Sequence, residues 1–126
     1  MTIATALARF DALLANAYSI DDKIQWLSRL DAMVKRHIDG YEGSDKVIFH
    51  GYDSSTDRRT ELLVQEPFDD MYLKWMEAQV HYYNGEYGKY NQAIIMFHAA
   101  YAAFTNDWSR NHLPLLPQMK YKGGIP

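Results

Sequence analysis

Residues 87–108 read YGKYNQAIIMFHAAYAAFTNDW, the longest amphipathic stretch of the chain. Apolar side chains recur in it at steps of three and four residues: Tyr87, Tyr90, Ile94, Phe97, Tyr101, Phe104 and Trp108. Because this spacing gathers them on one face of a helix, the stretch predicts a long α-helix. Asn84-Gly85, directly before it, is a strong turn signal. We therefore expect the helix to fold back on a preceding helix as an antiparallel pair.

The preceding helix is predicted to begin near Glu66-Pro67, because proline is well tolerated in the first turn of a helix. Asp69 and Asp70 suit the same turn, where negative charge interacts favourably with the helix dipole. One stripe follows, formed by Met71, Trp75, Ala78 and Tyr82, and a second row lies beside it: Tyr72, Met76, Gln79 and Tyr83. We expect the pair to span Asp69 to Trp108 and to form the core of a small, mostly α-helical bundle.

Two further helices are predicted in the first 40 residues. Residues 2–14 place one apolar stripe on a short helix: Ile3, Leu7, Phe10 and Leu14. Ser19, followed by Asp21 and Asp22, is typical of a helix start. The second helix carries one face of Ile24, Leu27, Leu30, Val34 and Ile38, and a second apolar line of Trp26 and Met33. Gly40 is expected to end it.

Residues 44–65 change character. Residues 46–50 and 61–65 read as short strands around a polar loop at 51–57, which suggests a β-hairpin or an extended arm. A lone hairpin is only marginally stable in water, so it must pack on the helices or pair with another chain. We expect four of its side chains to contact neighbouring subunits: Phe49, Tyr52, Leu62 and Val64.

The C-terminal residues 112–126 are predicted to form an extended tail, because Pro114 and Pro117 prevent a continued helix. Residues 1–111 then form one helical domain. The tail is more apolar than a purely solvated end requires, and we expect it to bind a partner through Leu113, Leu115, Leu116, Met119, Tyr121 and Ile125.

Composition excludes several functions. The chain has 126 residues, no cysteine and a net charge of −3, which argue against thiol chemistry and against direct recognition of DNA. The histidines show no metal-binding spacing, and Asp53-x-Ser55-x-Asp57 lacks the glycine and glutamate of a calcium loop. No phosphate-binding loop and no membrane span are present. We expect no enzyme activity, no cofactor and no metal.

Four tyrosines surround the Asn84-Gly85 turn: Tyr82, Tyr83, Tyr87 and Tyr90. They cannot all face inward from one turn, and tyrosine is enriched at protein–protein contacts. They are either a partly exposed core or an interface, and Tyr83 and Tyr87 are the two that we expect to contact a neighbouring subunit.

Several stretches also resemble a known family: residues 21–27, 51–53, 62–64, 71–91 and 97–101. They are similar to small proteins from the packaging clusters of tailed phages and prophages, in the class of head–tail connectors or adaptors. The resemblance extends over nearly the whole chain. It implies a homo-oligomeric ring, commonly of twelve subunits, that binds beneath the portal protein of the capsid.

The same resemblance implies that the ring also binds a stopper or tail-completion protein, and that DNA only passes through its channel. The protein would be in the host cytoplasm during assembly and at the head–tail junction of the virion afterwards. Connectors of this class often anchor to the portal through terminal segments, and this assigns the portal contact to the tail.

Two other functions remain open. Ala78, Tyr82, Gly85 and Tyr87 are spaced as in tetratricopeptide repeats, which suggests a helical-repeat adaptor of the host cytoplasm, although a solenoid needs about three such units. A small hydrolase or nuclease accessory protein would use Asp53, Asp57 or a histidine.

Overall fold

The computed structural model describes residues 1–115 and contains four helices: α1 (Ile3–Leu13), α2 (Ile20–Asp39), α3 (Met71–Tyr83) and α4 (Tyr87–Asn111). Across these residues the chain forms no β-strand, and its extended parts meet only at two isolated bridges, Thr2 with Glu61 and Tyr41 with Pro114. The predicted mostly α-helical fold class is therefore confirmed.

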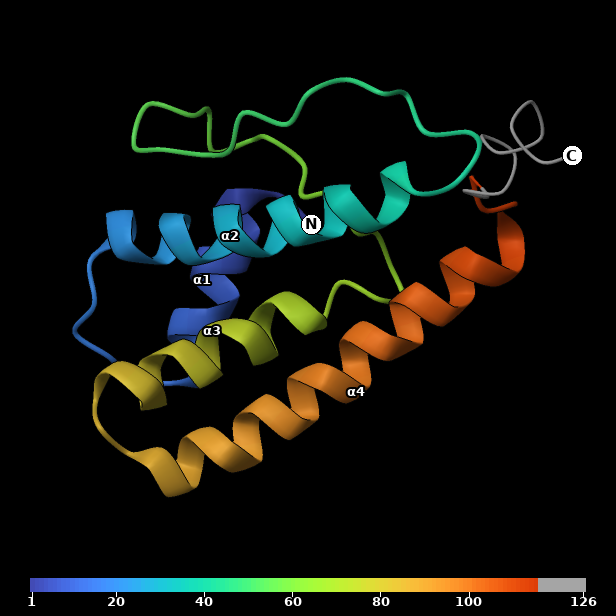
Figure 1. Ribbon diagram of the computed structural model, residues 1–126. Coiled ribbons are helices and arrows are strands. Elements are labelled where there is room, and N and C mark those ends of the chain that lie inside the picture. Colours follow the sequence, from blue (N-terminus) through green and yellow to red (C-terminus); the bar gives the residue numbers. More distant parts are fainter. Residues whose placement is uncertain (116–126) are drawn as a thin grey trace, which may run out of the picture.

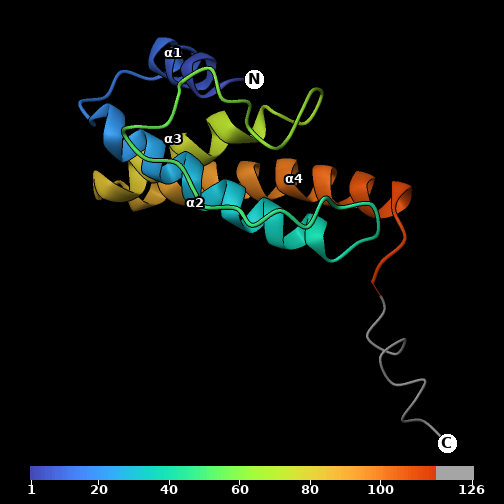
Figure 2. The same cartoon turned by 90° about the horizontal axis from the view of Figure 1, so that it is seen from above.

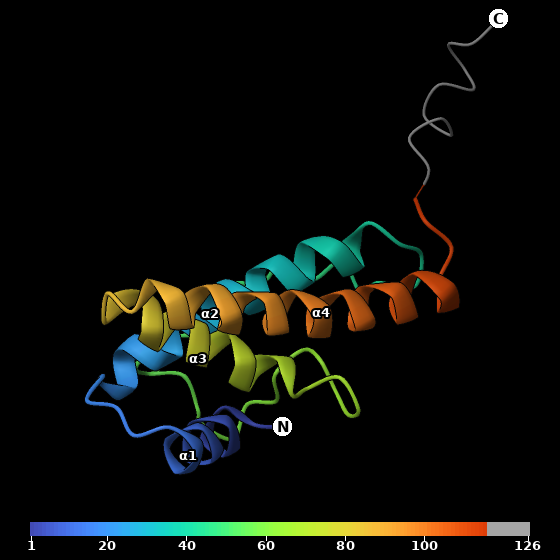
Figure 3. The same cartoon turned by 90° about the horizontal axis from the view of Figure 1, so that it is seen from below.

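Helix α3 lies at the centre of the fold, because it contacts each of the other three helices. Figure 1 shows α2, α3 and α4 following one another across the molecule, and Figures 2 and 3 show α1 and α4 on opposite sides of α3. Met71, Tyr72 and Met76 of α3 are fully buried. The hydrophobic core thus forms around the shortest of the three later helices.

The first two helices begin and pack as their sequence predicts. The side-chain oxygen of Thr2 accepts a hydrogen bond from the Thr5 N–H at 3.1 Å, and that of Ser19 accepts one from the Asp22 N–H at 3.1 Å. Such caps satisfy backbone donors that have no partner within the helix. Ile24, Leu27, Leu30 and Val34 of α2 are buried as predicted, whereas Ile38, the last residue of the predicted face, is half-buried.

The second apolar line predicted for α2, Trp26 and Met33, is buried only at Trp26. Trp26 is buried because the rings of Tyr18 and Tyr83 pack on it, with centroids 5.3 Å and 5.9 Å away. Met33 is 42% exposed. A residue seven positions along the helix therefore lies outside the contact that covers Trp26.

Helix α3 also begins later than predicted. Residues 65–70 form successive turns, in which the Phe68 N–H donates to the Gln65 carbonyl and the Tyr72 N–H to the Asp69 carbonyl. Asp69 is buried, and its carboxylate lies 3.5 Å from the Met1 amino group. It pairs with that cation and does not cap the helix, which starts at Met71.

Helix α4 is almost twice as long as α3, with 25 residues against 13. The turn at Gly85 has a positive φ of 75°, which glycine adopts without strain. Near the middle of α4, Phe97 packs on Trp75 with centroids 4.9 Å apart. Further along, Phe104 contacts Phe68 and His37, so the second half of α4 covers α2 and the turns before α3.

The predicted β-hairpin is wrong. Residues 44–65, called the arm here, first run along the outer side of α2 and then cross behind it towards α3 (Figure 1). The two supposed strands of the arm do not pair with each other. The second one pairs with the N-terminus instead: the Ile3 N–H donates to the Thr60 carbonyl at 3.0 Å, and the Leu62 N–H donates to the Met1 carbonyl at 2.9 Å. These bonds satisfy the backbone without a sheet.

Candidate interaction surfaces

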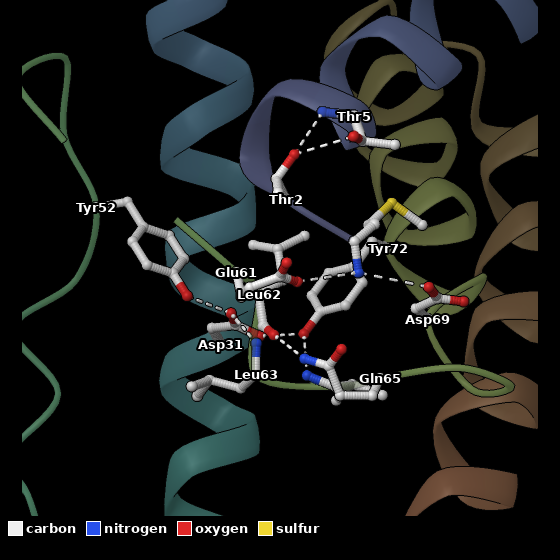
Figure 4. Close-up of polar contacts among 12 residues, drawn as sticks. Thr2, Thr5, Asp31, Tyr52, Glu61, Leu62, Leu63, Gln65, Asp69 and Tyr72 are labelled. Atoms are coloured by element: carbon white, nitrogen blue, oxygen red, sulfur yellow. Dashed lines mark hydrogen bonds and ion pairs between the residues drawn. The ribbon is translucent and has the colours of Figure 1, made fainter. Parts of the chain in front are cut away.

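A buried carboxylate fixes the arm to the helices. Asp31 of α2 accepts hydrogen bonds from the Tyr52 hydroxyl at 2.5 Å, the Leu63 N–H at 3.0 Å and the Tyr72 hydroxyl at 2.6 Å (Figure 4). The Tyr72 hydroxyl in turn accepts from the Val64 N–H at 2.8 Å. One carboxylate thereby joins α2, α3 and both halves of the arm.

Burial is the main influence on the pKa values of Asp31, Tyr52 and Tyr72. It raises the pKa of Asp31 above its ordinary value, while the hydrogen bonds from Tyr52, Tyr72 and Leu63 act in the opposite direction. Burial also raises the pKa of both tyrosine hydroxyls, with the nearby Asp31 carboxylate adding to the effect. The hydroxyls therefore stay protonated and act as donors.

Three residues predicted to contact neighbouring subunits belong to this chain's own core. Tyr52, Leu62 and Val64 are only 7%, 1% and 1% exposed, so they offer almost no surface to another molecule. The arm can come this close to α2 because residue 51 is glycine: a Cβ there would lie 2.8 Å from Ser28 Oγ, which accepts the Tyr52 N–H. Their alternation therefore reflects burial against helices, and the expectation of an inter-subunit role is corrected.

The outer side of the arm is apolar and accessible. Val47 and Ile48 are 64% and 73% exposed, Leu63 is exposed to a smaller extent, and Phe49 is half-buried with its ring edge-on to Tyr52. With Lys35, Ile38 and Asp45, these four side chains line a shallow hollow of about 130 Å³. We call Val47, Ile48, Phe49 and Leu63 the arm patch. Phe49 is the one predicted arm contact that remains on the surface.

The four tyrosines at the α3–α4 turn form a second accessible surface. Tyr82, Tyr83 and Tyr87 are exposed and Tyr90 is half-buried. The ring of Tyr82 makes edge contacts with the other three, at centroid distances of 5.2 Å to Tyr83, 6.1 Å to Tyr87 and 5.4 Å to Tyr90. We call these four residues the tyrosine cluster. Its rings support one another and leave their outer edges to solvent.

Beside this cluster lies an aromatic hollow of about 280 Å³, lined by Tyr18, Asp22, Gln25, Trp26, Arg29 and Tyr83. The rings of Trp26 and Tyr83 are almost parallel, with an interplanar angle of 6°. Two hydrogen bonds hold this wall: the Trp75 indole donates to the Trp26 carbonyl at 2.8 Å, and the Tyr18 hydroxyl donates to the Asn84 side chain at 2.6 Å. The hollow is thus a fixed feature of the fold.

The predicted tail starts from a defined position. The Glu42 N–H donates to the Leu113 carbonyl at 2.7 Å, and the Leu115 N–H donates to the Gly40 carbonyl at 2.8 Å. These bonds hold residues 113–115 at the end of α2, with the side chains of Leu113 and Leu115 exposed. The other predicted tail contacts lie outside the described residues: Leu116, Met119, Tyr121 and Ile125.

The residues considered for enzyme chemistry serve local structure. The Asp53 carboxylate accepts from the Ser55 N–H at 2.9 Å, and Asp57 pairs with Arg59 at 3.0 Å, both in exposed turns. Within residues 1–115, His, Asp and Glu side chains form no group that could hold a metal ion. In the same part of the chain, no helix is long and apolar enough to cross a bilayer.

The chain matches no family model, no curated protein and no solved structure. Three accessible, partly apolar surfaces of the chain are therefore the candidates for binding: the arm patch, the tyrosine cluster with its aromatic hollow, and the exposed start of the tail.

The Asp31 cluster and the aromatic hollow are not among the features that the sequence predicts. Asp31 lies at helical spacing between Leu27 and Val34, on the apolar stripe of α2. A polar residue on such a stripe is the signal that could have indicated a buried hydrogen-bond cluster. Tyr18 and Arg29 meet Tyr83 only through the packing of α2 on α3, for which the sequence carries no local signal.

Proposed function

We propose that the protein is a structural subunit of an oligomeric ring adaptor at the head–tail junction of a tailed phage. The observation that carries this proposal is the presence of two different exposed apolar surfaces on one small chain. The arm patch lies beside the second half of α2, and the tyrosine cluster lies at the α3–α4 turn. A head-to-tail contact that closes into a ring needs two such different surfaces on each subunit.

The phage setting comes from the resemblance of residues 71–91 and the other quoted stretches to head–tail connectors. In this proposal the ring has twelve subunits, binds the portal protein above and a stopper or tail-completion protein below, and lets DNA pass without reading its sequence. The protein has no catalytic role. It assembles in the host cytoplasm and remains in the virion.

The tail is the proposed portal anchor. Residues 113–115 are fixed to the end of α2, so the residues that follow leave each subunit from the same place. In a ring this presents one apolar segment per subunit to the portal, and many weak contacts then add up.

Electron microscopy and mass photometry of the full chain, with and without a phage portal protein, test this function. We expect rings, either alone or on the portal. A chain that stays monomeric at every concentration and does not bind the portal would contradict the proposal.

Two truncations test the anchor separately. A chain shortened after Leu115 keeps the hydrogen bonds to Gly40 and Glu42, whereas one shortened after Asn111 loses them. We expect both to keep the helical fold and both to lose portal binding. Normal portal binding by the chain that ends at Leu115 would place the anchor elsewhere.

A further inference from the structure

The aromatic hollow presents three polar side chains that have no hydrogen-bond or ion-pair partner within residues 1–115. Asp22, Gln25 and Arg29 follow one another at steps of three and four residues along α2, so they lie in one row beside the rings. Their backbone N–H groups are engaged within the helix and, at Asp22, with the Ser19 cap, so only the side chains are in question. No hydrogen bond or ion pair joins the three side chains to any residue between 1 and 115.

This combination suits an extended peptide with an apolar side chain. A carboxylate accepts a backbone N–H, a guanidinium donates to a backbone carbonyl, and an amide does both. The exposed ring of Tyr83 and the half-buried ring of Tyr18 provide an apolar wall beside these groups, with the buried Trp26 ring stacked behind Tyr83. Binding sites of this kind combine an apolar lining with a few placed polar groups.

The arm of the chain itself offers such a peptide. Ile48 is 73% exposed, more than any other large apolar side chain between residues 1 and 115. The backbone N–H groups of Ile48, Phe49 and His50 have no hydrogen-bond acceptor among residues 1–115. An extended segment with free backbone groups and an exposed apolar side chain is the usual ligand in peptide recognition.

Opposite charges are present on the two surfaces, with Asp22 and Arg29 both lining the hollow. Lys46 lies two residues before Ile48, and its ammonium group donates to the Asp39 carbonyl at 2.8 Å while remaining exposed. Asp22 lines the hollow, and Asp21 is its exposed neighbour. An ammonium group beside these carboxylates is attracted to them, and salt weakens that attraction.

We infer that Ile48 of one subunit inserts into the aromatic hollow of a second copy of this chain. The inference rests on the proposed ring function and names the contact that builds the ring. The hollow lies along the first half of α2, and the arm patch lies against Lys35 and Ile38 of its second half. Because the two surfaces differ and are displaced along α2, each copy binds one neighbour with its arm and another with its hollow.

Single substitutions test the contact in the full chain by mass photometry across a concentration series. Ile48→Asp and Tyr83→Asp each place a charge at the contact, and we expect each to raise the concentration for half-assembly at least about tenfold, which corresponds to about 1.4 kcal/mol. Ile95→Asp is the matched control, because Ile95 on α4 is 65% exposed and lies outside both surfaces. We expect it to assemble like the wild type.

Mixing two variants and reversing two charges together distinguish a lost contact from a misfolded variant. Mixing Ile48→Asp with Tyr83→Asp restores one intact contact per pair, so we expect pairs but no rings. Lys46→Glu should weaken assembly, and combining it with Asp22→Lys should restore it at least in part. Rescue by the second charge reversal would not follow from damage to the fold.

Cross-linking locates the contact directly, because the chain contains no cysteine. A chain with Val47→Cys and Gln25→Cys should give a ladder of covalent oligomers with a short bismaleimide reagent, whereas Ile95→Cys with Gln25→Cys should not. If the wild type forms rings but Ile48→Asp matches the Ile95→Asp control and the ladder is absent, this contact is wrong and the ring function stands. If the wild type forms no oligomer with or without portal, both proposals fail.

Discussion

The hydroxyl of Tyr72 on α3 donates to the carboxylate of Asp31 on α2 across 2.6 Å, and neither side chain reaches solvent. The same carboxylate holds the arm through Tyr52 and Leu63. The arm is therefore part of the folded core on one side, and only its outer side is available to a partner. This division underlies the predictions that concern it.

Replacing Asp31 with Ala should destabilise the protein by about 3 kcal/mol or more. The substitution leaves the hydroxyls of Tyr52 and Tyr72 and the N–H of Leu63 without their acceptor, and each buried donor left unpaired costs about 1–3 kcal/mol. Urea unfolding followed by circular dichroism measures the change. Gln25→Ala, at an exposed position of the same helix beyond its first turn, is the control and should change the unfolding free energy little. A change at Asp31 equal to that control would contradict the role of the carboxylate.

The stability contributed by Asp31 should fall as pH rises above its ordinary pKa of about 4. Burial raises the pKa of Asp31 in the folded state, so in this range the folded chain keeps a proton that the unfolded chain has lost. Raising the pH then favours unfolding until the folded-state pKa is passed. Asp31→Asn cannot titrate and lacks this loss. The difference in unfolding free energy between wild type and Asp31→Asn, measured from pH 3 upward, should therefore decrease, and an increase would show the opposite shift.

Replacing Phe97 with Ala should cost about 3–5 kcal/mol, the usual range for a buried aromatic side chain. Phe97 is almost fully buried and its ring packs on Trp75 and Tyr101. The unfolding midpoint in urea reports the loss. His98→Ala, on the next and exposed position of α4, is the matched control. An unchanged midpoint for Phe97→Ala would mean that α4 packs on α3 through another face.

Amide exchange should divide the arm into two parts. In the isolated chain we expect slow exchange at Tyr52, Leu62 and Val64, whose N–H groups are hydrogen-bonded, and fast exchange at Ile48 and Phe49. On assembly, the fast group should become protected. Uniformly fast exchange across residues 44–65 would mean that the Asp31 cluster does not hold the arm, and unchanged exchange at Ile48 would remove it from the contact between subunits.

The positions of the helices can be predicted from the sequence because caps and apolar stripes depend on residues close together in the chain. Ser19 caps α2 through its own side chain, and Ile24, Leu27 and Val34 lie on one stripe whatever they pack against. The start of α3 lies later than its local sequence predicts, for a non-local reason. Asp69 looked like a helix-start residue, but its carboxylate lies beside the amino group of Met1, which is distant in the sequence.

The interaction surfaces were only partly predictable. Exposure of Tyr83 and Tyr87 is predictable from the crowding of rings around one turn. Leu62 and Val64 have the alternation of a strand, and Tyr52 lies in the predicted loop, yet all three are buried in the core of this chain. The deciding partner is Asp31, which lies 21 residues from Tyr52 and 41 from Tyr72 in the sequence. Propensity within a short window cannot reveal such a pairing.

The central position of α3 has a consequence for synthesis on the ribosome. Helices α1 and α2 leave the ribosome first, but the helix that covers both of them is α3, which begins only at Met71. Until residues 71–83 have emerged, the apolar stripes that contain Phe10 and Leu27 have no complete partner. The nascent chain therefore exposes these stripes while the arm is being made, and this is the interval in which chaperones would bind it.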